Sequence, residues 1–146
     1  MCWDPYWPDT TTEEFWPIIG QIAVSNIALG AARMGSIGYW IDEAFAGRGI
    51  MPKTVALVVD YCFQVMKLHR IEVNIRPENI SSIRVVEKLG FRFEGTRNKL
   101  LHIDGDWRDH YSYALTAEEV PEGLLAGHLR KTRPVENKSG DSHAIT

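Results

Sequence analysis

Hydrophobic residues follow two different periods in the middle of the chain. From residue 51 to 66 they recur every three or four positions, which is typical of a helix with one buried face. Residues 70–76 alternate instead, and an apolar run over 36–42 precedes the helix, so both segments are predicted strands. This strand–helix–strand order predicts a βαβ unit with two parallel strands. The apolar face of the helix consists of Met51, Val55, Val58, Val59, Cys62, Phe63 and Met66.

Further elements flank this unit on both sides. Residues 17–29 are rich in β-branched side chains, which favours a strand that pairs with the strand over 36–42. Asn79 is a suitable N-cap for a second helix, and Gly90 is a suitable residue to end it. The dipeptide Asp104-Gly105 lies in the middle of 92–115 and predicts a hairpin there. The predicted fold class is α/β with a mixed sheet, built on the βαβ unit and a C-terminal hairpin.

The two ends of the chain lack such patterns. Residues 1–16 combine three tryptophans and two prolines with polar residues, and no element is assigned to them. Residues 120–146 are polar, and apart from a short helix around 124–129 they are predicted to form a flexible tail. One domain over residues 17–119 is expected between these ends.

Composition narrows the class of protein. The 146 residues suffice for one domain with a hydrophobic core, and the net charge of −3 argues against a general nucleic-acid binder. No apolar run is long enough to span a membrane, and there is no signal pattern. Cys2 and Cys62 form no disulfide framework, and no His and Cys residues have the spacing of a metal site. We therefore expect a cytoplasmic protein with no metal and no membrane or nucleic-acid partner.

A glycine-rich turn, Ala46-Gly47-Arg48-Gly49, joins the first strand of the βαβ unit to its helix. Backbone N–H groups at a helix start have no intrahelical partner and carry partial positive charge, so the turn suits a phosphate or pyrophosphate. The segment also comes within one residue of a P-loop, but Pro52 stands where the second glycine belongs. Pro52 is well placed as the first residue of a helix. Taken alone, the turn is as compatible with a plain strand-to-helix connection.

Several segments in this order resemble the GNAT superfamily of acyl-CoA-dependent N-acyltransferases, and more closely its RimJ/RimL branch, which acetylates the N-termini of ribosomal proteins. The resemblance covers about residues 18–119. It implies an N-acetyltransferase that moves an acetyl group from acetyl-CoA to a primary amine, on a ribosomal or other protein N-terminus or on a small molecule. The matching segments are 37–51, 69–91 with the pattern Asn79-x-x-Ser82-x-x-x-x-Glu87-Lys88-x-Gly90-Phe91, and 103–110 (IDGDWRDH).

The resemblance also implies how the coenzyme is held. Family members bind the coenzyme A pyrophosphate through backbone amides of a Gln/Arg-x-x-Gly-x-Gly/Ala loop. Its counterpart here runs from Ala46 to Met51, with departures at both ends. The preceding strand is expected to lend backbone groups to pantetheine, and Asn79 either reaches the coenzyme or acts as a plain N-cap. The expected coenzyme-binding residues are Trp40, Ile41, Gly47, Arg48, Gly49, Ile50, Met51, Asn79 and Ser82.

Two residues are candidates for the chemical step. Many family members use a Tyr seven residues after the Asn to protonate the leaving thiolate, but Val86 stands there. RimL-like enzymes have a Ser three residues after the Asn, and Ser82 matches it; the alternative is an ordinary serine of a first helical turn. No residue matches the family's Glu base. Strand alternation makes Glu72 the candidate base, with a salt bridge to Arg70 or Arg92 as the alternative.

One departure from the family concerns the N-terminal segment. Family members carry a strand, one or two helices and another strand before the position of Ile18, and those helices form a wall of the acceptor groove. The pattern is absent from residues 1–16, so we expect these elements to be missing and a sheet edge and face to be exposed, which favours a homodimer. Two functions fit the sequence: an acetyl-CoA-dependent N-acetyltransferase, or a non-catalytic acyl-CoA-binding or dimerising remnant of such a domain.

Overall fold

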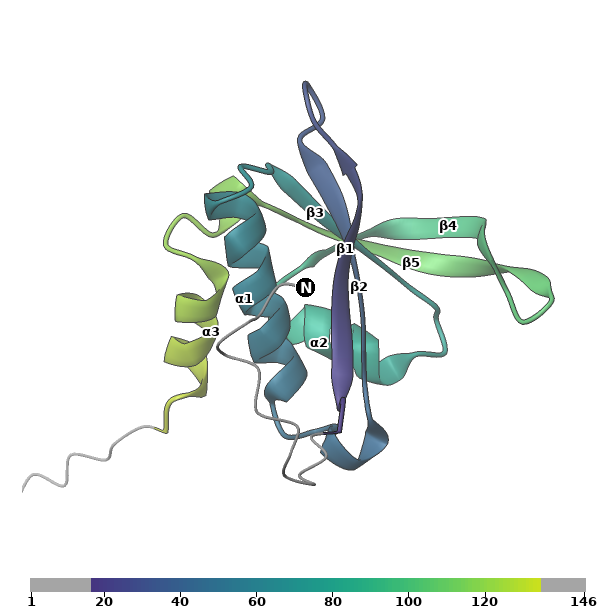
Figure 1. Ribbon diagram of the computed structural model, residues 1–146, viewed down its shortest axis with the longest axis horizontal. Helices are drawn as coiled ribbons and strands as arrows, with labels where there is room; N and C mark the ends of the chain where they lie inside the picture. Colours follow the sequence, from purple (N-terminus) through teal and green to yellow (C-terminus); the bar gives the residue numbers. More distant parts are fainter. Residues whose placement is uncertain (1–16, 135–146) are drawn as a thin grey trace, which may run out of the picture.

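The computed structural model describes residues 17–134, and the elements of this part of the chain follow the predicted order (Figure 1). Short 3-10 turns follow β2 and β5. The segment 1–16, which has no predicted element, lies outside the described residues. The strands and helices are β1 (Gly20–Ala28), β2 (Met34–Ile41), α1 (Ile50–Gln64), β3 (Arg70–Ile75), α2 (Ile80–Lys88), β4 (Arg92–Ile103), β5 (Asp106–Thr116) and α3 (Leu124–Thr132).

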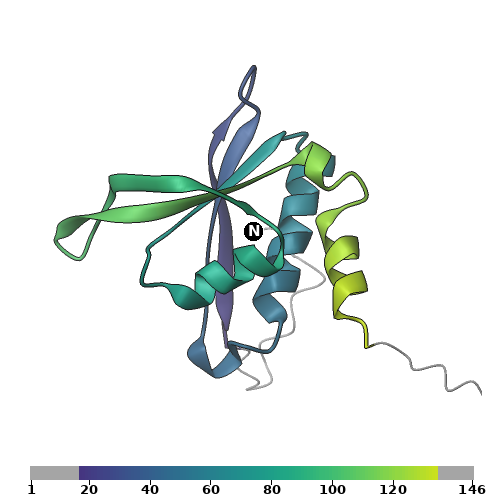
Figure 2. The same cartoon turned by 180° about the vertical axis from the view of Figure 1, so that it is seen from behind.

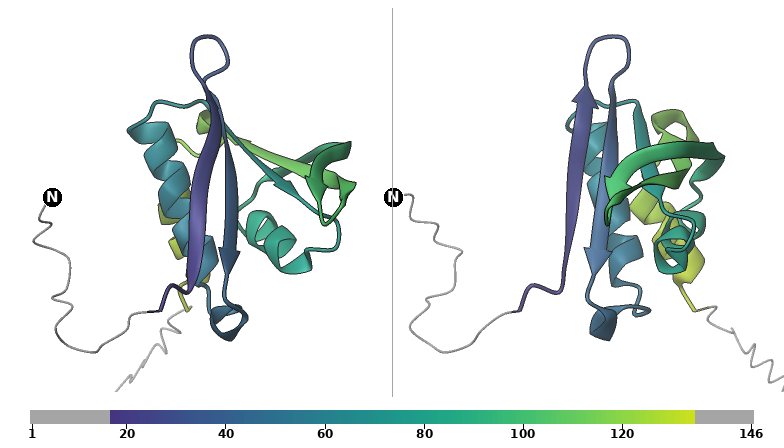
Figure 3. Two further views of the ribbon diagram at one scale, coloured as in Figure 1. Left: turned by 45° about the vertical axis from the view of Figure 1, so that its right-hand side comes forward. Right: turned by 90° about the vertical axis from the view of Figure 1, so that its right-hand side faces the viewer.

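The strands form one mixed sheet in the order β1-β2-β3-β5-β4. β2 and β3 are parallel and α1 connects them, while the other neighbours are antiparallel, so the predicted βαβ unit and mixed sheet are confirmed. Figures 1 and 2 show the β4–β5 hairpin projecting away from α1 and α3. In the right-hand view of Figure 3, β1 and β2 stand in front of α1.

The hydrophobic core lies between the sheet and the helices α1 and α2. α1 buries Val55, Val59 and Cys62 completely, as its period predicts. Ile71, Val73 and Ile75 of β3 face the same core, together with Ile83 and Val86 of α2. Alternation along β3 therefore sends its polar residues to the opposite face of the sheet.

Local capping explains where the helices and the hairpin begin and end. Asn79 caps α2, and Gly90 follows its last residues with φ of 80°, a left-handed conformation that glycine adopts without strain. Asp104 and Gly105 have φ of 52° and 82°, which is typical of the tight turn predicted between β4 and β5. Pro52 is a correction, because α1 begins at Ile50 and Pro52 is its third residue.

The predicted flexible tail is in part a helix. α3 packs against α1 and buries Leu124, which extends the short helix predicted around 124–129. Asp60 of α1 accepts hydrogen bonds from the backbone N–H groups of Leu124 (2.6 Å) and Leu125 (3.0 Å). Residues 135–146 lie outside the described part. None of the helices within 17–134 is long and apolar enough to cross a membrane.

Candidate functional site

The parallel strands β2 and β3 are paired only at their starts. Their register runs from Met34 with Arg70 to Ser36 with Glu72. β1 pairs with β2 as far as Ile41. On the side of β3, the main chain of residues 37–41 therefore has no strand partner. The carboxyl half of β2 opens a gap in the sheet, and its free backbone groups face that gap.

A cavity of about 470 Å³ lies where this half of β2 meets the beginnings of α1 and α2. It brings the strand end and the glycine turn that follows it together with the first turns of α2, which lie much further along the chain. Its lining residues are Tyr39, Trp40, Ile41, Phe45, Ala46, Gly47, Gly49, Ile50, Met51, Pro52, Asn79, Ser81, Ser82, Arg84, Val85 and Lys88.

The glycine turn forms a cradle at the start of α1. Gly47 and Gly49 have φ of 75° and 76°, and a Cβ atom built on either would have no neighbour within 4 Å. The open space beside their backbones is therefore available to a ligand. The first four N–H positions of a helix lack intrahelical acceptors. In α1 they belong to residues 49–52, and because Pro52 has no N–H, three donors remain.

The cavity collects every expected coenzyme-binding residue except Arg48. The Arg48 guanidinium lies over the Phe45 ring instead, 5.3 Å from its centroid. Trp40 lines the cavity, and its indole Nε1 donates a hydrogen bond to Gln21 on β1 (3.3 Å).

Asn79 and Ser82 lie together at the start of α2. The Asn79 side-chain oxygen accepts hydrogen bonds from the Ser82 N–H (3.2 Å) and the Ser81 hydroxyl (3.1 Å), so the N-cap interpretation is confirmed. A contact between Asn79 and a coenzyme stays a prediction. Ser82 lines the cavity beside it.

Tyr39 is a site residue that the sequence reasoning missed. Its hydroxyl donates a hydrogen bond to the Ser82 carbonyl (2.7 Å) and so ties β2 to α2 across the cavity. Burial raises the pKa of this phenol above its ordinary value, so it stays protonated at neutral pH. The available signal was strand alternation, which places Tyr39 on the same face of β2 as the buried Ile37.

Glu72, the candidate base, does not line the cavity. One carboxylate oxygen accepts from Arg70 (2.9 and 3.0 Å) and the other from Arg97 (3.0 Å), and the residue is only 5% exposed. The salt-bridge alternative is therefore confirmed for Arg70, while Arg97 takes the place expected for Arg92. Ser82 and Glu72 are not brought together, since Ser82 is hydrogen-bonded to Tyr39, about 10 Å along β2 from Ser36, the residue that is level with Glu72.

Comparison with known proteins agrees with this geometry. A family model for the acetyltransferase (GNAT) domain matches residues 6–92. The chain belongs to the GNAT acetyltransferase family. The family resemblance stated from the sequence is thereby confirmed, and so is the fold class.

Relatives of this GNAT chain include proteins and structures of the RimJ type. The probable N-acetyltransferase YjcK of Bacillus subtilis is 46% identical over 98 residues, which are 67% of this chain and 54% of that protein. The [ribosomal protein uS5]-alanine N-acetyltransferase of Escherichia coli is 35% identical over 106 residues, 73% of this chain and 55% of that protein. Mycobacterium smegmatis RimJ in complex with CoA-disulfide is 40% identical, with a TM-score of 0.76 over 80% of this chain and 56% of RimJ. The chain spans about half the length of the curated relatives it matches.

Proposed function

We propose that this chain binds acetyl-CoA in the cavity beside the glycine turn and transfers the acetyl group to a primary amine. The observation that carries the proposal is the meeting of the unpaired end of β2 with the cradle formed by Gly47 and Gly49. The M. smegmatis relative, solved with CoA-disulfide, supports the choice of ligand.

The backbone supplies most of the binding in this proposal. The free N–H groups at residues 49–51 and the positive end of the α1 dipole hold the diphosphate. The unpaired main chain of residues 37–41 holds the pantetheine arm as an added strand would be held. Contacts of this kind tolerate the departures at Ala46 and Met51, because both residues still contribute backbone atoms.

The chemical step needs a neutral amine as nucleophile and a leaving group, and it removes two protons from the acceptor nitrogen and delivers one to the sulfur. Acetyl-CoA supplies a thioester, so a bond forms between the amine nitrogen and the acetyl carbon while the carbon–sulfur bond breaks. Ser82 gives its hydroxyl proton to the departing sulfur and is reprotonated from water. The acceptor ammonium gives one proton to water and then attacks as the neutral amine, and its nitrogen gives a second proton to water after the attack. Water takes both protons in this proposal, because Glu72 is held by Arg70 and Arg97 away from the cavity.

For the acceptor we propose a protein N-terminal amine, with ribosomal proteins as the first candidates, in the cytoplasm. The E. coli relative, whose name specifies alanine on ribosomal protein uS5, supports this choice. Small-molecule amines are the second class of acceptor.

Calorimetric titration with acetyl-CoA tests the binding half of the proposal, and release of free CoA thiol in the presence of an amine panel tests the chemical half. The panel contains peptides that begin with alanine, the same peptides N-terminally blocked, and polyamines. Saturable binding with turnover of unblocked peptides is the expected result. Binding without any turnover would favour the non-catalytic remnant, and no binding by the folded chain would overturn the proposal. Light scattering of the same sample tests the expected homodimer.

Ser82→Ala isolates the proposed proton donor. Loss of general acid catalysis typically costs about 100-fold or more in rate. We expect turnover to fall by that order while acetyl-CoA affinity is retained. Ser81→Ala is the matched control on the same helical turn. Equal activity of both variants would remove Ser82 from the mechanism.

A further inference from the structure

A second open pocket adjoins the coenzyme cavity at the other side of the α1 N-terminus. It has a volume of about 410 Å³ and is lined by Gly49, Pro52, Lys53, Lys88, His128, Lys131 and Thr132. Gly49, Pro52 and Lys88 also line the coenzyme cavity, so the two spaces meet at the glycine turn. Three helices contribute to it: α1, α2 and α3.

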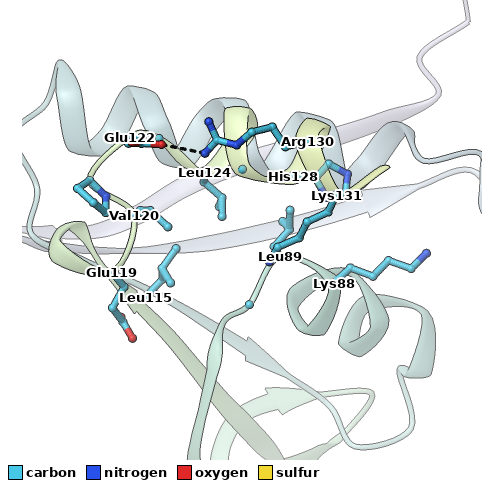
Figure 4. Close-up of a pocket in the computed structure, with 14 residues that line it drawn as sticks. Lys88, Leu89, Leu115, Glu119, Val120, Glu122, Leu124, His128, Arg130 and Lys131 are labelled. Atoms are coloured by element: carbon cyan, nitrogen blue, oxygen red, sulfur yellow. Dashed lines mark hydrogen bonds and ion pairs between the residues drawn. The ribbon is translucent and has the colours of Figure 1, made fainter. Parts of the chain in front are cut away.

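The pocket concentrates positive charge in a chain whose net charge is −3. Lys53, Lys88 and Lys131 come from three different helices, and within residues 17–134 none of them forms an ion pair with a carboxylate. Figure 4 draws a neighbouring pocket that shares Lys88, His128 and Lys131 with this one, and it shows His128 beside Lys131 on α3 and Lys88 on α2. Like charges gathered without a counter-charge disfavour each other, and an anion bound among them relieves that repulsion.

The buried side chain of His128 is affected by the same three lysine charges. It is buried, and its pKa lies below the ordinary value because of burial and then the charges of Lys53, Lys88 and Lys131. The three ammonium groups therefore act on one common location. At neutral pH the imidazole is uncharged, so the lysines carry the positive charge of the pocket.

We infer that Lys53, Lys88 and Lys131 form a second phosphate site, which binds the phosphate that coenzyme A carries on its ribose 3′-oxygen. The inference rests on the proposed function, because the diphosphate of the same ligand must lie in the cradle at Gly49. Lys53 is one helical turn beyond Gly49, about 6 Å along the axis. The 3′-phosphate is separated from the diphosphate by a single ribose, which suits this spacing.

The site gives α3 a role in ligand selection. α3 follows the segment 6–92 that the family model matches, and it is held on α1 by Asp60. By bringing Lys131 to the pocket, it adds a charge that selects for the 3′-phosphorylated coenzyme. A charge-assisted contact is stronger than a neutral one, so each lysine contributes measurably to affinity.

Calorimetry of the full chain with CoA and with 3′-dephospho-CoA tests the inference. We expect at least tenfold tighter binding of CoA at physiological ionic strength. Lys131→Ala and Lys53→Ala are expected to weaken CoA severalfold and to leave dephospho-CoA unchanged. Arg130→Ala is the matched control, because it removes the same charge from the same helix but Arg130 pairs with Glu122 outside this pocket.

The outcomes distinguish a failure of the second phosphate site from a failure of the proposed acetyl-CoA binding. Equal affinity for both ligands would overturn the phosphate site while leaving the proposed function standing. Failure to bind either ligand would overturn both. Inorganic phosphate is titrated in a third arm. If it occupies the pocket without weakening CoA binding, the site belongs to free phosphate and the inference is wrong.

Discussion

The two faces of the sheet use their polar groups in opposite ways. On the face that carries the helices, the coenzyme cavity presents unpaired backbone groups of β2 and of the α1 start. On the other face, side chains of β3 and β4 form an ion-pair network in which Glu72 and Glu94 share Arg70. Of the described buried side chains on that face, Asn74 and Ser112, which are cross-strand partners, have polar atoms without a hydrogen bond.

The difference shows which polar groups are free to act on a ligand. Glu72 was a reasonable candidate base from strand alternation, yet its carboxylate is occupied by two guanidinium groups. The amides at residues 49–51 have no such partners, and a ligand gains from satisfying them. We therefore expect ligand binding on the helix-covered face and a stabilising role for the network on the other face.

We expect the largest effect from a substitution at Gly49 that fills the open space at the glycine turn. Gly49→Val places a β-branched residue at φ of 76° and directs its side chain into the open space beside the turn. The left-handed conformation alone costs about 1–2 kcal/mol, and the side chain adds a clash with any bound phosphate. We expect acetyl-CoA affinity to fall about 100-fold or more, a loss of about 2.7 kcal/mol, measured by calorimetry.

Gly127→Ala is the control for this experiment. Gly127 lies inside α3, its added methyl group has no neighbour within 4 Å, and a glycine-to-alanine change there stabilises a helix by up to about 1 kcal/mol. Its coenzyme affinity is expected to equal that of the unmodified chain. Retained affinity in Gly49→Val would place the diphosphate elsewhere.

The second prediction concerns the other face alone. Glu72→Gln keeps the shape of the side chain but removes the charge that Arg70 and Arg97 share. We expect the free energy of unfolding to fall by about 2 kcal/mol in urea denaturation, while coenzyme affinity stays unchanged.

The matched control is Glu78→Gln, since the Glu78 carboxylate is 72% exposed and its pair with Arg76 is expected to contribute less than about 1 kcal/mol. If Glu72→Gln instead kept its stability and lost turnover, Glu72 would return as the catalytic base.

Signals local in sequence predicted most of the fold and half of the residues that line the cavity. The apolar period of α1, the N-cap at Asn79 and the turn at Asp104-Gly105 each act within a few residues, so the pattern alone reveals them. The glycine turn and its resemblance to the GNAT loop likewise predicted eight of the sixteen lining residues.

Contacts between residues far apart in the sequence could not be predicted from these local patterns. Arg97 reaches Glu72, although Arg92 is the residue of β4 that is level with Glu72 across β5, and no local pattern encodes this pairing. Asp60 caps α3 from 64 residues away, and the sequence alone predicts only a short helix around 124–129 within a polar tail. Tyr39 was missed for a related reason, since its partner is a backbone carbonyl of α2.

The third prediction tests what holds α3 on the helix-covered face of the sheet. Gly123 offers α3 no side-chain cap, and Asp60 supplies the acceptor instead. Asp60→Ala is expected to lower stability by about 1 kcal/mol, or about 2–4 °C in melting temperature, and to speed amide exchange over residues 124–132. Asp60→Asn keeps one acceptor oxygen, so its stability is expected to lie between that of the unmodified chain and that of Asp60→Ala. Unchanged exchange in Asp60→Ala would show that apolar packing alone holds α3.

The smallest expected effect comes from the edge of the ion-pair network. The hydrogen bond from Arg70, followed by that from Arg92, lowers the pKa of Glu94 to about 2. A lowered carboxyl pKa stabilises the fold above the ordinary value of 4.5, and this contribution is lost as pH falls from 4.5 to about 2. Glu94→Gln should therefore flatten the dependence of stability on pH within that window, measured by urea denaturation at several pH values. Because Glu94 is partly exposed, the change is expected to be small and to shrink in high salt. Glu122→Gln, which removes an exposed partner of Arg130, should leave the slope as it is. An equal slope in all three proteins would mean that Arg70 stabilises the network through Glu72 alone.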